Sequence, residues 1–179
     1  MDAVDLHSAL VIGHSMGSAI ALVLALDHPM RVLGLGLVGA GARLRVAPDI
    51  IEQSSNQTTF INAVTTVISR SFSPQAPARL TELAARRMAE TRPSVLYGDF
   101  LACNEFDVRD RLDEIRQPTL VLCGEEDQMT PVRHAQFLAS GIPNASLKVI
   151  PAAGHMVMLE QPQAVAAALS DFIGGIAYY

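Results

Sequence analysis

The sequence predicts an α/β protein with a mostly parallel sheet of about four strands and a helical insertion. Two observations lead to this prediction. Short apolar runs alternate with helix-like segments towards both ends of the chain, whereas strand-like runs disappear between residues 43 and 112. Strands that alternate with helices favour parallel pairing with right-handed crossovers.

The N-terminal part predicts a strand, a helix and a second strand. The apolar run Ala9–Ile12 is too short for a helix and is closed by Gly13, which is typical of a buried parallel strand. Ser18–Leu26 is rich in Ala and Leu and ends before Pro29, so it predicts a helix packed against the sheet. Val32–Val38 predicts the second buried strand.

The middle of the chain predicts a helical insertion. Its apolar residues recur at helical spacing, which predicts roughly three to five amphipathic helices. Examples are Phe60, Val64, Val67 and Ile68, and again Leu80, Leu83, Ala84 and Met88. We therefore divide the chain into a core, formed by residues 1–42 and 113–179, and an insertion formed by residues 43–112.

Regular alternation resumes after the insertion. Thr119–Cys123 and Leu147–Ile150 predict strands, and Pro131–Ser140 and Gln163–Ile173 predict the helices that follow them. The carboxyl ends of these strands are expected to meet at one edge of the sheet, where catalytic groups gather in open α/β sheets.

Composition excludes several classes of function. The chain has 179 residues with a net charge of −5 and no basic cluster, so nucleic acid is not an expected partner. No apolar run approaches the length needed to span a bilayer, and the N-terminus lacks the pattern of a secretory signal. Two cysteines, Cys103 and Cys123, cannot build a disulfide framework, so we expect a cytoplasmic protein.

The segment Gly13-His14-Ser15-Met16-Gly17 matches the G-x-S-x-G nucleophile elbow. A serine on a tight strand-to-helix turn has a strained backbone, and small residues two positions before and after it avoid collisions with the strand and the helix. The turn exposes the hydroxyl of Ser15 and directs the Met16 N–H towards the same space as an oxyanion donor. Five-residue patterns arise by chance, but here the pattern lies between a predicted strand and a predicted helix, as the elbow requires.

A serine nucleophile needs a base, and the base needs an acid. Of the five histidines, His155 follows the last predicted strand and precedes the last predicted helix. Asp127 follows the strand that ends at Cys123 and can reach a histidine on the adjacent strand end. The order Ser15, Asp127, His155 is that of α/β-type hydrolases. His28 and His134 are predicted to lie on helix ends or surfaces, and Glu125 and Glu126 in a solvated turn.

Other motifs carry less weight. Gly34-Leu35-Gly36-Leu37-Val38-Gly39 fits the dinucleotide fingerprint G-x-G-x-x-G, but its first glycines lie inside a predicted strand and no helix clearly opens at Gly39. No histidine pair has a metal-binding helical spacing, so neither a metal nor a cofactor is predicted. The candidate substrate-pocket residues are His14, Met129 and Met156, although ordinary packing explains the methionines equally well.

These residues resemble the α/β-hydrolase family, in particular its small esterase-, lactonase- and cofactor-free-haloperoxidase-like members. The triad pattern carries the resemblance, together with the segments 113–124 (DEIRQPTLVLCG), Gly154-His155-Met156 and Glu160-Gln161-Pro162. The resemblance implies that the sheet is the C-terminal part of that fold and that residues 43–112 are a cap over the active site.

Members of that family have strands ahead of the serine and a loop there that donates a second oxyanion N–H. Because the elbow serine is residue 15, we expect that loop to lie outside this chain and Ala9–Ile12 to form a bare sheet edge. A fragment, a natural truncation that dimerises through this edge, and one half of a split protein would each explain the pattern. A homo-oligomer joined at Ala9–Ile12 is predicted.

Two functions follow from the sequence. The first is a serine hydrolase of small carboxylic esters or related acyl compounds that uses Ser15, His155 and Asp127, weakened by the lack of a second oxyanion donor. The alternative is a non-catalytic remnant of a hydrolase that persists as an oligomerising or binding module.

Overall fold

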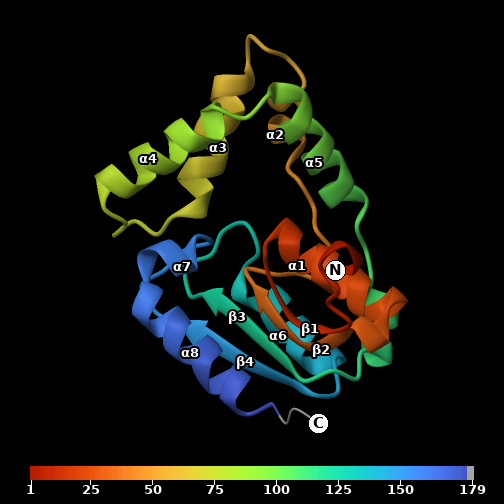
Figure 1. Cartoon of the computed structure of the whole chain (residues 1–179). Coiled ribbons are helices and arrows are strands. Elements are labelled where there is room, and N and C mark those ends of the chain that lie inside the picture. The colour runs from red at the N-terminus through yellow and green to blue at the C-terminus, as the bar shows by residue number, and fades with distance from the viewer. Residues whose placement is uncertain (177–179) are drawn as a thin grey trace.

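The computed structural model describes residues 1–176 and contains a four-stranded parallel sheet (Figure 1). The strands lie side by side in the order in which they occur in the chain, each parallel to its neighbours. They are β1 (Ala9–His14), β2 (Val32–Val38), β3 (Thr119–Gly124) and β4 (Ala145–Ile150). The predicted fold class is confirmed, and the predicted core segment 113–179 runs on into three residues that lie outside the described range.

Helices cover both faces of the sheet. Alternate residues of β3 belong to two different apolar clusters, because successive side chains of a strand point to opposite faces. Val121 packs with residues of α1 (Met16–Asp27) and α6 (Val132–Gly141). Leu122 packs with residues of α7 (Val157–Glu160) and α8 (Pro162–Gly174) on the other face. Short 3-10 turns complete this part of the chain at Asp2–Val4, Pro29–Arg31 and Arg109–Glu114.

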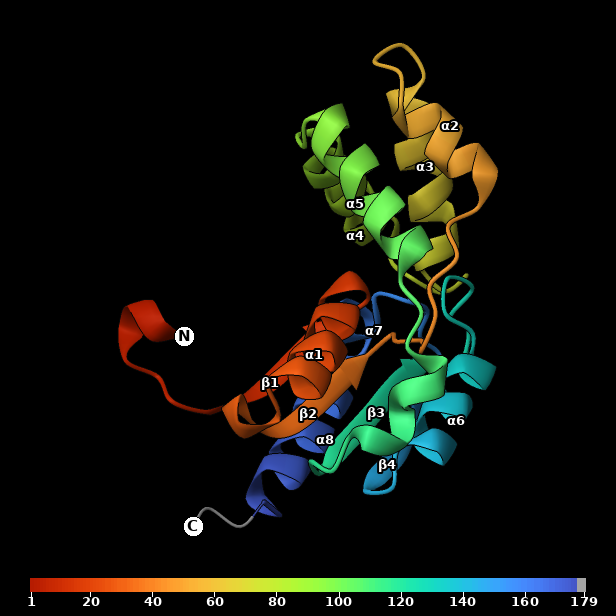
Figure 2. The ribbon, with the colours of Figure 1, turned by 90° about the vertical axis from the view of Figure 1, so that its right-hand side faces the viewer.

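The middle of the chain forms helices that stand beyond the carboxyl ends of the strands (Figures 1 and 2). They are α2 (Pro48–Ser54), α3 (Phe60–Ser71), α4 (Ala78–Ala89) and α5 (Pro93–Glu105). Their own apolar cluster centres on the buried residues of α3 and Phe72, against which Leu80, Ala84, Met88 and Leu96 pack. We call residues 48–105 the cap helices.

The chain enters and leaves the cap helices through two hydrogen-bonded segments. The Val108 N–H donates to the Ala42 carbonyl at 2.8 Å, and the Leu44 N–H donates to the Phe106 carbonyl at 3.3 Å. Arg43 and Asp107 form an isolated antiparallel bridge between these segments. The division of the chain into a core and an insertion at residues 43 and 112 stays a prediction.

The elements extend further than the sequence patterns suggest. The helix α1 begins at Met16 rather than Ser18, because Ser15 itself occupies the turn that precedes the helix. The strand β1 continues to His14, since Gly13 and His14 still pair with β2. The short helix α7 was not predicted, because four residues are too few for a helical periodicity to appear.

The strand β1 forms one edge of the sheet, as expected for Ala9–Ile12. Its neighbour β2 carries glycine at two positions where a side chain would collide with it: a Cβ on Gly34 would lie 2.9 Å from Leu10, and one on Gly36 would lie 2.9 Å from Ile12. These glycines thus make room for β1 side chains. Because both lie inside β2 and the next helix begins only at Pro48, the dinucleotide fingerprint lacks its helix.

Within the described residues, the structure contains no helix that is both long enough and apolar enough to span a membrane.

Candidate active site

Ser15 occupies the turn between β1 and α1 with a strained backbone. Its φ of 53° and ψ of −117° are rare for a residue with a side chain. The Ser15 N–H donates to the Val38 carbonyl at 2.9 Å, and the buried Ser18 hydroxyl binds the carbonyls of Gly13 and Val38 at 2.6 and 3.1 Å. These hydrogen bonds hold the turn against the neighbouring strand β2.

The two glycines of the elbow differ in the space around them. A Cβ on Gly13 would lie 2.2 Å from the carbonyl oxygen of Gly17, which backbone atoms cannot accommodate. A Cβ on Gly17 would meet nothing within 4 Å. The steric argument made from the sequence is therefore correct for Gly13 and wrong for Gly17, because Gly17 already lies in the first turn of α1 and faces open space.

His155 and Asp127 are hydrogen-bonded to each other. The distance between His155 Nδ1 and Asp127 Oδ2 is 2.8 Å, and both residues are only 4% exposed. The backbone N–H groups of Met129 and Thr130 each donate to Asp127 Oδ1 at 2.8 Å, and the Thr130 hydroxyl donates to Oδ2 at 2.9 Å. Burial raises the pKa of Asp127, but the hydrogen bonds from His155 and Thr130 outweigh burial and leave that pKa below its usual value.

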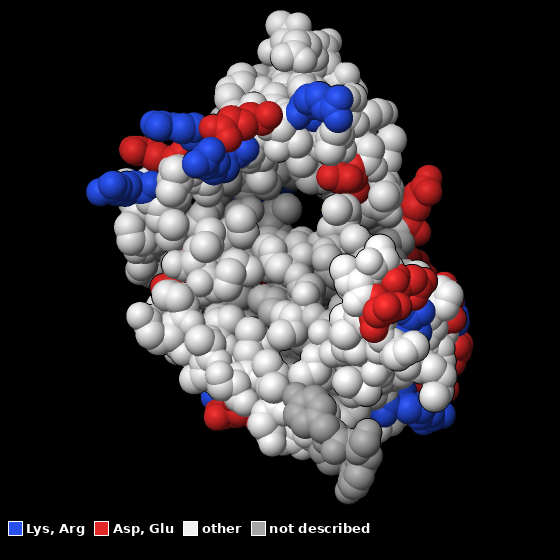
Figure 3. Space-filling view, viewed as in Figure 1, with Lys and Arg blue, Asp and Glu red and all other residues white. Residues whose placement is uncertain are grey.

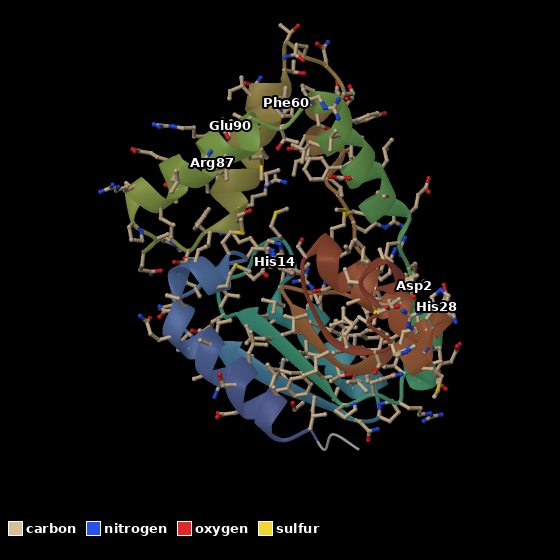
Figure 4. The ribbon with its side chains drawn as sticks, in the orientation of Figure 1. Asp2, His14, His28, Phe60, Arg87 and Glu90 are labelled. Carbon is tan, nitrogen blue, oxygen red and sulfur yellow. The ribbon has the colours of Figure 1, made fainter. Side chains whose placement is uncertain are left out.

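His14 contacts the same histidine from the elbow side. Its Nε2 lies 3.0 Å from the carbonyl oxygen of His155, and the two ring centroids are 4.7 Å apart. Because that oxygen can only accept, Nε2 of His14 carries the proton. Burial and the neighbouring His155 lower the pKa of His14 to about 4. His14 is therefore neutral at pH 7 and donates to the backbone of the histidine loop; Figure 4 labels it between the sheet and the cap helices.

Gly39 packs against both rings. It has a φ of 54°, and a Cβ there would lie 3.0 Å from Cε1 of His155 and 3.3 Å from Cδ2 of His14. The glycine-rich turn after β2 thus provides space for the two histidines.

The loop that carries His155 is attached to the end of α3. The Met156 N–H donates to the Ser71 carbonyl at 2.9 Å. The Glu160 carboxylate accepts from the Gly154 N–H at 2.8 Å and from the Ser73 N–H at 2.9 Å, so it joins the histidine loop to the cap helices.

A cavity of about 180 Å³ lies beside the elbow. Figure 3 shows that the molecule is hollowed between the cap helices and the part that bears the sheet. Both apolar and basic residues line the cavity beside Ser15; they include Arg43, Arg45, Ile50, Arg70, Phe100, Met129, Thr130 and His134.

The predicted substrate-pocket residues occupy three different environments. Met129 lines the cavity beside Ser15. His14 contacts His155 instead, and Met156 packs against the apolar cluster of the cap helices. Met16 is the first residue of α1, so its N–H has no carbonyl one turn earlier to bind within the helix. The contribution of these residues to a substrate pocket or an oxyanion hole stays a prediction.

Several residues of this site were not predicted from the sequence. Thr130 could have been noticed, because a hydroxyl three residues after an aspartate often closes a local turn. Glu160 and the arginines gave no local pattern, since their partners are distant in sequence. His134 was assigned to a helix surface, yet it lines the cavity.

Among residues 1–176, no group of three or more His, Cys, Asp or Glu side chains is placed to hold a metal ion. Cys123 is buried in β3, and burial together with Asp127 raises the pKa of its thiol to about 11. Cys103 does line the cavity, and burial together with Asp99 raises the pKa of its thiol as well. A thiol with a raised pKa is a weak nucleophile at neutral pH, so Ser15 is the nucleophile candidate beside the cavity.

Comparison with known proteins defines the class. A family model described as alpha/beta hydrolase fold matches residues 1–162, and the chain belongs to this family. A curated relative from Caulobacter sp. (strain K31), named "Putative carbamate hydrolase RutD", is 33% identical over 98% of this chain and 69% of its own length.

Solved structures give the same class. A thermophilic esterase is 38% identical, with a TM-score of 0.86 over 95% of this chain and 67% of its own. Est816, described as an N-acyl homoserine lactone degrading enzyme, is 29% identical with a TM-score of 0.83 over 96% of this chain and 70% of its own. The enol-lactonase from Burkholderia xenovorans LB400 shares the fold, with a TM-score of 0.90 at 22% identity, covering 97% of this chain and 68% of its own.

Proposed function

We propose that the protein is a serine hydrolase of carboxylic esters or related acyl compounds. The observation that carries this proposal is the 2.8 Å hydrogen bond between the buried His155 and Asp127, on the loops that follow β4 and β3. The strained Ser15 lies at the carboxyl end of β1, the same edge of the sheet. Membership of a hydrolase family and likeness to an esterase and a lactone-degrading enzyme support this class of reaction.

In this proposal Ser15 Oγ attacks the carbonyl carbon while His155 Nε2 takes the hydroxyl proton. Asp127 accepts the Nδ1–H of His155, which fixes the tautomer that leaves Nε2 free and stabilises the imidazolium that forms. The Met16 N–H stabilises the developing oxyanion. The imidazolium then protonates the leaving alcohol, and a water activated by the same histidine hydrolyses the acyl-enzyme.

The chain spans about two thirds of the length of the relatives that it matches. The proposed Met16 N–H is one oxyanion donor, and the loss of a single donor from an oxyanion hole costs on the order of 10² to 10³ in kcat.

A fluorophosphonate probe followed by peptide mass spectrometry tests the proposal. We expect covalent labelling at Ser15, no labelling of Ser15→Ala, and normal labelling of Ser140→Ala, which removes an exposed helix serine. Labelling that persists in Ser15→Ala, or a folded protein that never labels, contradicts the proposed nucleophile. Hydrolysis of p-nitrophenyl acetate measures the turnover that accompanies labelling.

The alternative function, a non-catalytic module that assembles through β1, is favoured by the position of that strand at the sheet edge. Its Ile12 is 45% exposed, and the unpaired backbone groups of an edge strand are a template for pairing with a second copy. Light scattering at micromolar concentration tests assembly: we expect a homo-oligomer that Ile12→Lys weakens, and a monodisperse monomer contradicts it. Assembly without probe labelling favours the module over the enzyme.

A further inference from the structure

Arginine side chains gather around the cavity that contains Ser15. Three of them line it: Arg43 and Arg45 from the segment after β2, and Arg70 from α3. A second cavity of about 370 Å³ shares Arg43, Arg45 and His134 with the first and adds Arg109 and Arg133. Five arginines therefore surround two adjoining cavities in a protein whose net charge is −5.

Acidic side chains neutralise only part of this charge. Asp107 is shared, because Arg109 binds it through two hydrogen bonds of 2.8 and 2.7 Å and Arg43 lies 3.5 Å from it. Arg70 lies 3.2 Å from Asp49. Among the described residues, no acidic side chain lies within 4 Å of the guanidinium of Arg45 or Arg133. Two aspartates thus pair with three of the five arginines.

Arg45 is the arginine best placed to meet a ligand that reaches Ser15. Arg43 and Arg45 both lie on the connection between β2 and α2 and line both cavities, but Arg45 alone of the two is exposed and has no acidic side chain within 4 Å among the described residues. The rest of the inner cavity includes apolar residues such as Ile50, Phe100 and Met129, which suit a short hydrocarbon chain. The site therefore combines a nucleophile candidate, an apolar wall and a basic wall.

We propose that this site selects acyl substrates that carry a second, ionised acid group, so that a carboxylate meets Arg45 while the ester carbonyl meets Ser15. The guanidinium fork matches a carboxylate with two parallel hydrogen bonds. A hemiester of a short dicarboxylic acid is the ligand class that fits. This inference rests on the proposed hydrolase function and specifies its substrate.

The kinetic test compares 4-nitrophenyl hydrogen adipate, which is anionic, with its neutral methyl-capped ester. We expect the wild type to favour the anionic ester by on the order of 10-fold in kcat/KM, the effect of a charge-assisted contact with an exposed arginine. Arg45→Ala and Arg45→Gln should remove the preference by lowering kcat/KM for the anionic ester more than for the neutral ester. The control Arg86→Ala removes an exposed arginine of α4 that lines neither cavity and should retain it. Equal rates for the two esters in the wild type overturn the inference while the hydrolase proposal stands.

A binding test separates the inference from catalysis. Titration calorimetry of adipate into Ser15→Ala should detect binding. The double variant Ser15→Ala/Arg45→Ala should bind adipate more weakly, on the order of 10-fold. Dimethyl adipate, which carries no charge, should not bind to Ser15→Ala in the same way. Adipate binding in a protein that fluorophosphonate does not label would retain the anion site and reject the hydrolase. If adipate does not bind, or binds equally with and without Arg45, the anion site is rejected whatever the esterase result.

Discussion

The strand ends and the cap helices are held in place by different kinds of interaction. At the strand ends, buried side chains such as Asp127 and His155 make several short hydrogen bonds, and backbone atoms touch where glycine alone fits. In the cap helices, α3 buries one face, whereas α4 and α5 have no fully buried residue. The comparison indicates that the candidate catalytic side chains at the strand ends tolerate little displacement, whereas substitutions in α4 and α5 should cost less stability.

The largest effect is expected at Gly13. Gly13→Ala places a methyl group 2.2 Å from a backbone oxygen, so we expect a loss of about 3 kcal/mol or more in the free energy of unfolding, measured by denaturant titration. The matched variant Gly17→Ala meets open space in a helix and should be neutral or stabilising by about 1 kcal/mol. Similar losses of stability in both variants would mean that the backbone around Gly13 leaves room for a side chain.

The next largest effect is expected from His14, which should make the free energy of unfolding depend on pH. The unfolded chain protonates His14 near pH 6.5, whereas the folded protein does so near pH 4, so stability is full above pH 6.5 and falls as the pH drops to 4. The expected loss from this group is about 3 kcal/mol.

Unfolding of wild type and His14→Gln across pH 4–7 measures this loss. The decline should be smaller in His14→Gln, because the amide can still donate to His155 but does not titrate. His134, whose pKa is lowered by burial and by Arg133, contributes in the same direction to both proteins. Asp127, with a lowered pKa, contributes stability that is lost only below its usual pKa of 3.8. Identical pH profiles would show that His14 is not held neutral.

A smaller effect is expected at Glu160, where the two regions meet. Glu160→Ala leaves the Gly154 and Ser73 N–H groups without their acceptor, which should cost about 2 kcal/mol and slow fluorophosphonate labelling of Ser15. Glu160→Gln keeps one acceptor oxygen and should recover part of the labelling rate. Unchanged labelling in Glu160→Ala would indicate that the histidine loop does not depend on the cap helices for its position.

The smallest effect is expected on the outer surface of the cap helices. Arg87 in the last turn of α4 and Glu90, which follows that helix, form an exposed ion pair of 3.0 Å; both are labelled in Figure 4. Arg87→Ala should change the free energy of unfolding by less than about 0.5 kcal/mol, because exposed pairs are screened by water and salt. A loss of more than about 1 kcal/mol by denaturant titration, twice that limit, would show that α4 is more tightly coupled to the rest of the molecule than its burial indicates.

From the sequence alone one could predict the succession of strands and helices along the chain, the elbow pattern and the placement of Asp127 near His155. These predictions rest on local patterns, because a short apolar run indicates a buried strand and the carboxyl ends of parallel strands lie at the same edge of the sheet. The catalytic roles of Ser15, Asp127 and His155 remain predictions that labelling and mutagenesis test.

The residues that surround Ser15, Asp127 and His155 could be identified only from the packed structure, because they are distant in sequence. His14 and His155 are 141 residues apart, and Ser73 and Glu160 are 87 apart, so no periodicity links them. The arginines of the two cavities come from the connection after β2, from α3, from the turn before β3 and from α6. Such contacts depend on how whole helices and strands pack against one another. Local sequence patterns do not encode that packing, so they cannot predict which distant side chains come into contact.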